Sequence, residues 1–304
     1  MIPREPLARD LLAALAWQLD LGADEAILDA PVDRFAEAPG AGAIAPGAGA
    51  IAPGAGTIAP PARTPDARAG ATGATPDAPR GRAGATGMTP DARPGPDAGA
   101  AGAGLAAAAA TLAELAEAMR GFEGSDLRLG ARSLVFADGL PGARLMVIGE
   151  APGADEDRMG KPFVGRAGQL LDRMLAAIGL SRAAPDPERA AYITNVLPWR
   201  PPGNRTPSAA EAALFLPFLI RHIELAAPDF ILALGNTPVQ ALLSSGTGIT
   251  RIRGRWQRHG PTGCLILPSF HPAYLLRSPE KKREAWRDLL ALRAALDGAP
   301  VVPE

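Results

Sequence analysis

The chain has 304 residues, enough for one or two domains, and it is rich in glycine (35) and proline (32) but poor in aromatic residues (5%). The formal net charge of −1 hides an asymmetry, because residues 125–304 carry 22 Lys and Arg against 17 Asp and Glu, whereas residues 1–124 carry 9 against 15; the basic half suits a polyanion partner. Because the chain has one cysteine, an intramolecular disulfide and a cysteine-ligated metal cluster are excluded. No apolar run is long enough to span a bilayer and no secretory signal is visible, so we expect a cytoplasmic protein without a membrane partner.

The first predicted element is an amphipathic helix over residues 7–28, within an N-terminal segment of residues 1–37. Four leucines share one face of this helix: Leu11, Leu12, Leu15 and Leu19. An isolated helix needs a surface to pack on. Docking on the folded part of the same chain is favoured over docking on a partner protein, whose identity the sequence does not give.

Residues 38–104 are of low complexity. Ile-Ala-Pro recurs at residues 44, 51 and 58, and Thr-Pro-Asp-Ala recurs at residues 64, 75 and 89. The seven-residue period does not indicate a coiled coil, because glycine and proline in every unit are incompatible with a helix. Too few large apolar side chains are present to offset the entropy of ordering, so this segment is predicted to be a flexible linker.

Residues 105–304 are predicted to form the main folded domain, which begins with a helix over residues 105–121. Strands and helices then alternate. The predicted strands are Arg144–Ile148, Ala191–Leu197, Asp229–Leu234 and Cys264–Leu267, and the helices are 166–178, 208–226, 237–244 and 280–296. Repeated βα units predict a parallel sheet with helices on both faces. We therefore expect a three-layer α/β/α sandwich around a central, mainly parallel four-stranded sheet.

Unusual residues follow each predicted strand, in the segments 149–171, 195–207, 235–237 and 268–277. Ligands of such sheets bind beyond the carboxyl ends of the strands. The Phe163 ring could stack on a flat base, and the Asn195 amide offers a donor and an acceptor that match the imide edge of a uracil-like base. His271 could donate a hydrogen bond to a carbonyl oxygen that gains negative charge.

Each of these residues also has an ordinary structural explanation. A loop phenylalanine is usually core, an asparagine at a strand end often caps a turn, and the arginines from Arg251 to Arg258 could form a solvated face. The functional interpretation is favoured because the residues gather at four consecutive strand ends. The acidic run Asp155–Asp157 is interpreted as a solvated turn or helix start, because contiguous carboxylates rarely converge on one ion; no metal site is predicted.

Three motifs carry a resemblance to a known family: GEAPG with GKPFVGRAGQLL, TNVLPWRPPGNRTP, and HPAYLLR. In this order and spacing they resemble family four of the uracil-DNA glycosylase superfamily, from Ser125 to Leu296. The resemblance implies an enzyme that flips uracil out of DNA and hydrolyses its N-glycosidic bond, leaving an abasic site and initiating base excision repair. The alternative is a non-catalytic or covalently trapping uracil-DNA-binding protein. A nucleotide-binding hydrolase has less support, because no phosphate-loop lysine motif is present.

The resemblance also implies roles for residues around the base. Gly149, Glu150 and Ala151 would lie around the sugar and the attacking water, with Glu150 as the candidate general base. Ala151 stands where the best-studied uracil glycosylases have a water-activating aspartate. Phe163 and Asn195 would then stack on the uracil and read its imide edge.

Further roles concern the leaving group and the DNA. His271 would stabilise the departing uracil anion at O2, and Leu275 would wedge into the gap left in the base stack. Ser269 would shape a loop that faces phosphate. The arginines predicted to meet the DNA backbone are Arg205, Arg251 and Arg253.

Members of this family carry four cysteines that ligate a [4Fe–4S] cluster. The matching positions here are Phe122, Ser125, Trp199 and Phe215, none of which can ligate iron through sulfur. We therefore predict a protein without cofactor, in which bulky side chains such as Trp199 and Phe215 fill the volume of the cluster. The predicted state is a monomer that binds uracil-containing DNA.

Overall fold

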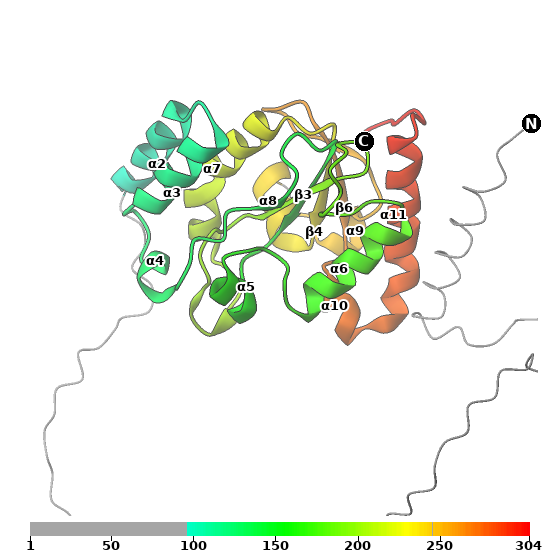
Figure 1. Ribbon diagram of the computed structural model, residues 1–304, viewed down its shortest axis with the longest axis horizontal. Coiled ribbons are helices and arrows are strands. Elements are labelled where there is room, and N and C mark those ends of the chain that lie inside the picture. The colour runs from blue at the N-terminus through cyan, green and yellow to red at the C-terminus, as the bar shows by residue number, and fades with distance from the viewer. Residues whose placement is uncertain (1–95, 245) are drawn as a thin grey trace, which may run out of the picture. The chain divides into compact units, whose positions relative to one another are not determined.

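The computed structural model describes residues 96–244 and 246–304 (Figure 1). The N-terminal segment and most of the predicted linker lie outside these residues. None of the described helices combines the length and the apolar character that are needed to cross a membrane.

A six-stranded sheet forms the centre of the described chain, in the order β1-β3-β2-β4-β6-β5. The strands are β1 Asp138–Gly139, β2 Leu145–Gly149, β3 Ala191–Asn195, β4 Phe230–Leu234, β5 Gln257–Arg258 and β6 Leu265–Ser269. The four middle strands are parallel, as predicted. The edge strands β1 and β5 pair antiparallel and were not predicted, because two residues are too few to show an alternating pattern.

The long helices agree with the predicted ones to within two residues at each end. They are α6 Arg166–Ala177, α7 Ala209–Ala226, α8 Asn236–Leu243 and α11 Lys282–Leu296. Short helices that were not predicted are α4 Leu127–Gly130, α9 Ile249–Ile252 and α10 Pro272–Arg277. Helix α5, Ala154–Met159, has the acidic run in its first turn, where a turn or a helix start was predicted. The start of α7 follows from its sequence, because the Ser208 hydroxyl accepts from the Glu211 N–H and the Glu211 carboxylate accepts from the Ser208 N–H.

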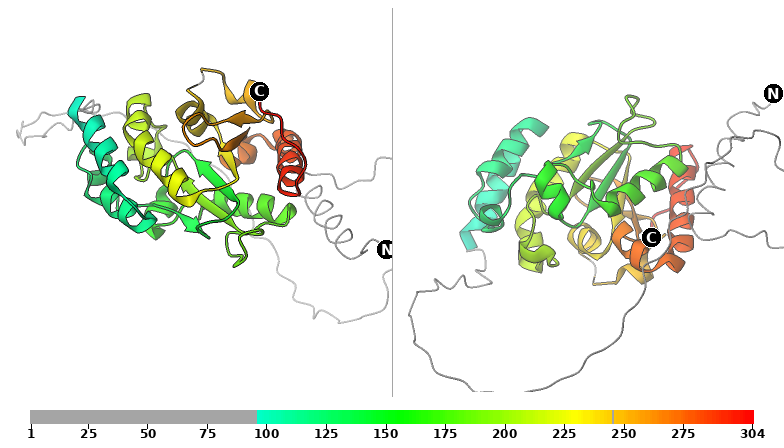
Figure 2. Two further views of the ribbon diagram at one scale, coloured as in Figure 1. Left: turned by 90° about the horizontal axis from the view of Figure 1, so that it is seen from above. Right: turned by 60° about the horizontal axis from the view of Figure 1, so that its bottom comes forward.

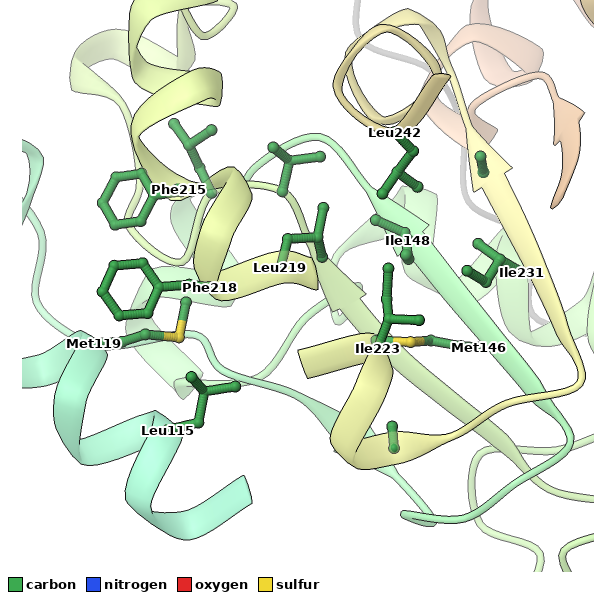
Figure 3. Packing of buried hydrophobic residues seen from close by; sticks show 14 of the residues in the cluster. Leu115, Met119, Met146, Ile148, Phe215, Phe218, Leu219, Ile223, Ile231 and Leu242 are labelled. Carbon is green, nitrogen blue, oxygen red and sulfur yellow. The ribbon is translucent and has the colours of Figure 1, made fainter. Parts of the chain in front are cut away.

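Helices cover both faces of the sheet, which confirms the predicted three layers. Figures 1 and 2 place α2 and α3 on one side of the sheet and α11 on the other. Alternate residues of β2 enter two cores: Met146 and Ile148 pack with α3, α7 and α8 (Figure 3), whereas Leu145 and Val147 pack with α6 and α11. Every residue of β2, β3 and β4 is buried, as expected of a parallel sheet between two helix layers.

The predicted helix over residues 105–121 is two helices, α2 Pro96–Ala108 and α3 Leu112–Gly121. The break is caused by Thr111, whose hydroxyl caps α3 by accepting from the Glu114 N–H at 3.1 Å. Helix α2 begins inside the segment predicted to be linker up to residue 104, so that boundary is wrong. Gly102 has no side chain that would crowd the Phe218 ring, which lets this alanine-rich helix pack closely on α7.

Candidate functional site

The carboxyl ends of the parallel strands are aligned. Gly149, the last residue of β2, pairs with Asn195, the last residue of β3, and Leu234 of β4 pairs with Ser269 of β6. The segments that follow these residues therefore begin at one edge of the sheet. This register brings together residues from loops that are far apart in the sequence.

Phe163 and Asn195, two of the predicted base-binding residues, both lie against a third, Gly149. A Cβ atom at this position would lie 2.4 Å from Asn195 Oδ1 and 2.5 Å from the Phe163 ring, so the contact requires glycine. Phe163 and Asn195 are each only 6% exposed. The Phe163 ring also stacks on the His271 ring, with centroids 5.4 Å apart and an angle of 29° between the planes.

Phe163 is held in an unusual backbone conformation, with φ of +53°. The Glu156 carboxylate accepts from the two backbone N–H groups that follow Phe163, at 2.9 and 3.0 Å. From the other side, Arg182 donates to the carbonyls of Phe163 and of the residue before it, both at 2.9 Å. Strained residues persist where the surroundings fix them, and such positions concentrate at ligand sites. Sequence reasoning assigned Glu156 to a solvated acidic run and gave Arg182 no role, because no local motif marks either residue as a contact of the Phe163 loop.

The acidic run is only partly solvated, which corrects the predicted interpretation. Asp155 is exposed, but Asp157 is 4% exposed and its Oδ1 accepts from the backbone N–H groups of Arg132 and Ser133 at 2.8 and 3.1 Å. The carboxylates of Glu156 and Asp157 therefore fix loops through backbone N–H groups. Within the described ranges, no group of three or more His, Cys, Asp or Glu residues could hold a metal ion.

His271 is placed to act as a neutral hydrogen-bond donor. It caps the N-terminus of α10, and its Nδ1 accepts from the Ala273 N–H at 3.1 Å. In the neutral ring the proton is therefore on Nε2. Burial, helped by the positive charge of Arg277 and opposed by the carboxylate of Glu156, lowers the pKa of His271 to about 4, so the ring is neutral at pH 7.

Glu150 and His271 line the same cavity, of about 1190 Å³. Ala151 and Tyr274 also line it, whereas the more deeply buried Phe163 and Asn195 do not. The Glu150 carboxylate accepts from the hydroxyl of Thr237 at 2.7 Å. Thr237 is in the third predicted strand-end segment, but sequence reasoning gave it no role.

The predicted DNA wedge, Leu275, is not available to DNA. Its side chain is 0% exposed and belongs to the core between the sheet, α6 and α11. It lies one helical turn after His271, on the inner side of α10, so insertion into a base stack would unpack that core. The wedge assignment is therefore wrong; its neighbours Tyr274 and Leu276 are both partly exposed.

We expect Leu275→Ala to lower the free energy of unfolding by about 2–5 kcal/mol, because it leaves a cavity in a closed core. Urea unfolding followed by circular dichroism measures this change. Leu276→Ala is the matched control, and its effect should be much smaller because Leu276 is partly exposed. A stable Leu275→Ala protein that is defective only in uracil excision would restore the wedge role.

Two further predicted DNA contacts point into the protein. Ser269 is 0% exposed and donates from its hydroxyl to Asp288 at 2.7 Å. Arg253 forms an ion pair with the same carboxylate, so neither residue is free to bind phosphate. Arg205 and Arg251 are both exposed, and Arg205 donates two hydrogen bonds to Glu211. Arg205 and Arg251 stay predicted DNA contacts.

The positions that match cluster cysteines do not fit a metal cluster. Phe122, Trp199 and Phe215 are buried in one hydrophobic core, and the rings of Phe122 and Phe215 pack edge to face at 5.9 Å. The Ser125 hydroxyl accepts a backbone N–H two residues along, and Cys264 lies elsewhere, beside β6. Aromatic packing therefore occupies this place, and no thiolate is present there to bind iron.

The three-layer fold and the site at the carboxyl edge of its sheet define an α/β domain that binds a flat, polar ligand. Residues 136–290 match the family model of the Uracil DNA glycosylase superfamily. A Type-4 uracil-DNA glycosylase of Thermotoga maritima is 39% identical over 169 residues, which are 54% of this chain and 83% of that protein. Another, of Saccharolobus solfataricus, is 36% identical over 178 residues, which are 56% of this chain and 79% of that protein. The chain belongs to the uracil-DNA glycosylase superfamily.

Proposed function

We propose that this protein flips uracil out of DNA and hydrolyses its N-glycosidic bond, leaving an abasic site for base excision repair. The observation that carries the proposal is the contact of Phe163 and Asn195 at Gly149 and the stacking of Phe163 on His271, which lines one cavity together with Glu150. Relatives that bear the name Type-4 uracil-DNA glycosylase support the same chemistry. Base flipping is required because a base inside the duplex does not present its glycosidic bond to an active site.

Recognition of uracil is assigned to Phe163 and Asn195. The phenyl ring offers a flat apolar face on which a flipped base stacks. The Asn195 amide accepts from uracil N3–H and donates to O4, whereas cytosine presents the opposite pattern at these two positions. The hydrogen bonds of Glu156 and Arg182 to the backbone around Phe163 hold this loop in place before the base binds.

Cleavage breaks the bond between sugar C1′ and uracil N1, and the bonding electrons leave with the base. The resulting negative charge is shared between N1 and the carbonyl oxygens of uracil. The Nε2–H of neutral His271 donates to O2, and this hydrogen bond strengthens as the charge develops. The interaction therefore stabilises the transition state more than the bound substrate.

Water completes the reaction by adding its oxygen to C1′. Glu150 is the proposed acceptor of the water proton, and Thr237 orients the carboxylate through its hydrogen bond. The proton lost by water balances the proton that the uracil anion takes up from solvent. The products are free uracil and a deoxyribose with a hydroxyl group at C1′.

The hydrogen bond at His271 favours hydrolysis over the trapping alternative. Covalent capture would require a ring nitrogen with a free lone pair to attack C1′. Nδ1 of His271 already accepts from the backbone, and Nε2 carries the proton in the neutral ring. A donor of this kind stabilises the leaving anion but is a poor nucleophile.

The proposed enzyme works without an iron–sulfur cluster, because aromatic side chains stand at the ligand positions. The same chain is proposed to act as a monomer in the cytoplasm, which rests on the sequence alone. No step of the proposed mechanism uses a metal.

The test is an excision assay on single- and double-stranded oligonucleotides that contain one uracil. We expect abasic sites, revealed by alkaline cleavage, from purified protein treated with a chelator and free of iron. Oligonucleotides with hypoxanthine or xanthine define the range of bases. A denaturing gel in the same experiment detects a persistent protein–DNA band, which would favour trapping. Absence of product on every uracil substrate would refute the proposed function.

A further inference from the structure

A buried carboxylate on α11 lies behind the segment that carries His271. Asp288 is 1% exposed and accepts from the Ser269 hydroxyl at 2.7 Å. Arg253, which follows α9, donates from Nε to the same carboxylate at 3.0 Å and from a second nitrogen to its other oxygen. The proposed mechanism uses neither Asp288 nor Arg253.

This ion pair is connected to each of the three residues that precede His271. The Pro268 carbonyl accepts from the Gly254 N–H at 2.9 Å, next to the arginine. Ser269 is held by the carboxylate through its hydroxyl. The guanidinium group lies 5.4 Å from the centroid of the Phe270 ring. The position of His271, the next residue, is therefore set by contacts from both partners of the pair.

The backbone packs closely against the Asp288 carboxylate. Gly254 has φ of +73°, and a Cβ atom there would lie 2.7 Å from Asp288 Oδ1. On the other side of the segment, the Gly235 N–H donates to the Ser269 carbonyl at 2.9 Å. Hydrogen bonds from α11, from the turn after α9 and from the residue after β4 thus hold the last residues of β6 in place.

The protonation state of Asp288, and with it the ion pair to Arg253, is sensitive to pH. Burial raises the pKa of Asp288 to about 6, although the hydrogen bonds from Ser269 and Arg253 lower it; the nearby Glu284 raises it. Glu284 is itself paired with Lys281 at 2.7 Å. The desolvation cost of a buried ion pair can offset its Coulombic gain, so such a pair adds little to the free energy of unfolding. Its best-attested role is to favour one conformation over others.

We propose that Asp288 is a positioning residue for His271, acting through Ser269 and Arg253 to hold the histidine at the leaving uracil. This inference rests on the proposed function, since it gives His271 its task. It assigns to Arg253 and Ser269 an internal role in place of the DNA contacts that their sequence positions suggested. Asp288 touches neither the base nor the sugar.

The test compares the unaltered protein with Asp288→Asn in steady-state excision, which gives kcat and KM, and in single-turnover excision, which isolates the cleavage step. Asparagine keeps the size of the side chain but weakens the pairing with Arg253. We expect kcat to fall roughly 10- to 100-fold with KM nearly unchanged, because misplacement of a catalytic group affects the transition state. Asp297→Asn is the matched control: it removes an exposed pair with Arg293 on the same helix and should leave kcat unchanged.

The pH profile separates positioning from folding. As pH falls through about 6, Asp288 in the unaltered protein takes up a proton and its pair with Arg253 weakens. We therefore expect kcat to decline on this acid limb, and Asp288→Asn to lack the decline. Should Asp288→Asn fail to fold, Ser269→Ala keeps the ion pair and removes the link to β6; its kcat is expected to fall as well.

A measurement without DNA keeps this inference distinct from the proposed function. The chain has three histidines, so the imidazole nitrogen signals are few enough to assign by NMR. Asp288→Asn should shift the His271 signals and leave those of His222 unchanged. Unchanged His271 signals together with unchanged kcat would overturn the inference while uracil excision by the unaltered protein still stood. No excision by the unaltered protein would instead overturn the proposed function.

Discussion

Replacement of His271 by alanine is expected to lower kcat for uracil excision by about 100- to 1000-fold, with little change in KM. The loss corresponds to removing one donor aimed at an oxygen that becomes negative in the transition state. The Nε2–H is available for this purpose because Nδ1 accepts from the Ala273 N–H. Steady-state kinetics on a uracil oligonucleotide measure kcat and KM, and single-turnover kinetics separate cleavage from product release.

Two variants sharpen the result. His271→Gln keeps an N–H donor of similar reach and should recover part of the lost rate. His259→Ala is the control, because His259 is also buried but hydrogen-bonds Thr262 in the turn between β5 and β6. An excision rate of His271→Ala equal to that of the unaltered protein would remove this residue from the mechanism. A parallel loss in His259→Ala would indicate general destabilisation.

Asn195→Asp is expected to reduce the preference for uracil over cytosine by on the order of 10⁴-fold. A site built to bond a polar edge rejects a base that leaves its buried groups unpaired, and such rejection reaches this size. The carboxylate has no donor for uracil O4 and can accept from the amino group of cytosine. Because Asn195 is only 6% exposed, water does not replace the lost hydrogen bond.

The measurement is the ratio of kcat/KM on matched oligonucleotides with uracil or cytosine at one position. Asn236→Asp is the matched control: it makes the same chemical change at a residue that also lines the cavity but is exposed, and whose Oδ1 accepts from the Ile249 N–H at 2.8 Å. We expect the base preference of this control to stay near that of the unaltered protein. An unchanged preference in Asn195→Asp would show that the imide edge is read elsewhere.

Much of the site follows from local pattern. Apolar runs ended by glycine or polar residues predict parallel strands, and a parallel sheet presents their carboxyl ends at one edge. That reasoning places Gly149, Asn195 and His271 together, and the structure has them in contact through Phe163. The boundaries of α7 and α8 are equally local, because caps and turns within a few residues set them.

The residues that were misassigned show the limit of such patterns. Leu275, Ser269 and Arg253 have the right types and spacing for DNA contact, yet all three face the interior. Exposure depends on which distant segment packs against a residue. Asp288 follows Ser269 by 19 positions and Arg253 by 35, and no local signal links them.

The start of the folded domain is a similar case. Alanine and glycine around Gly102 read as linker because they carry little apolar surface of their own. Helix α2 is stabilised by Phe122 and Phe218, whose rings lie against Gly102 from two other helical segments. Short-range periodicity therefore determines where the strands lie along the chain and which edge of the sheet carries the residues proposed to bind uracil. Only long-range packing decides which neighbouring side chains are exposed at that edge and which are buried and support it. Burial depends on contacts between segments that are far apart in the chain.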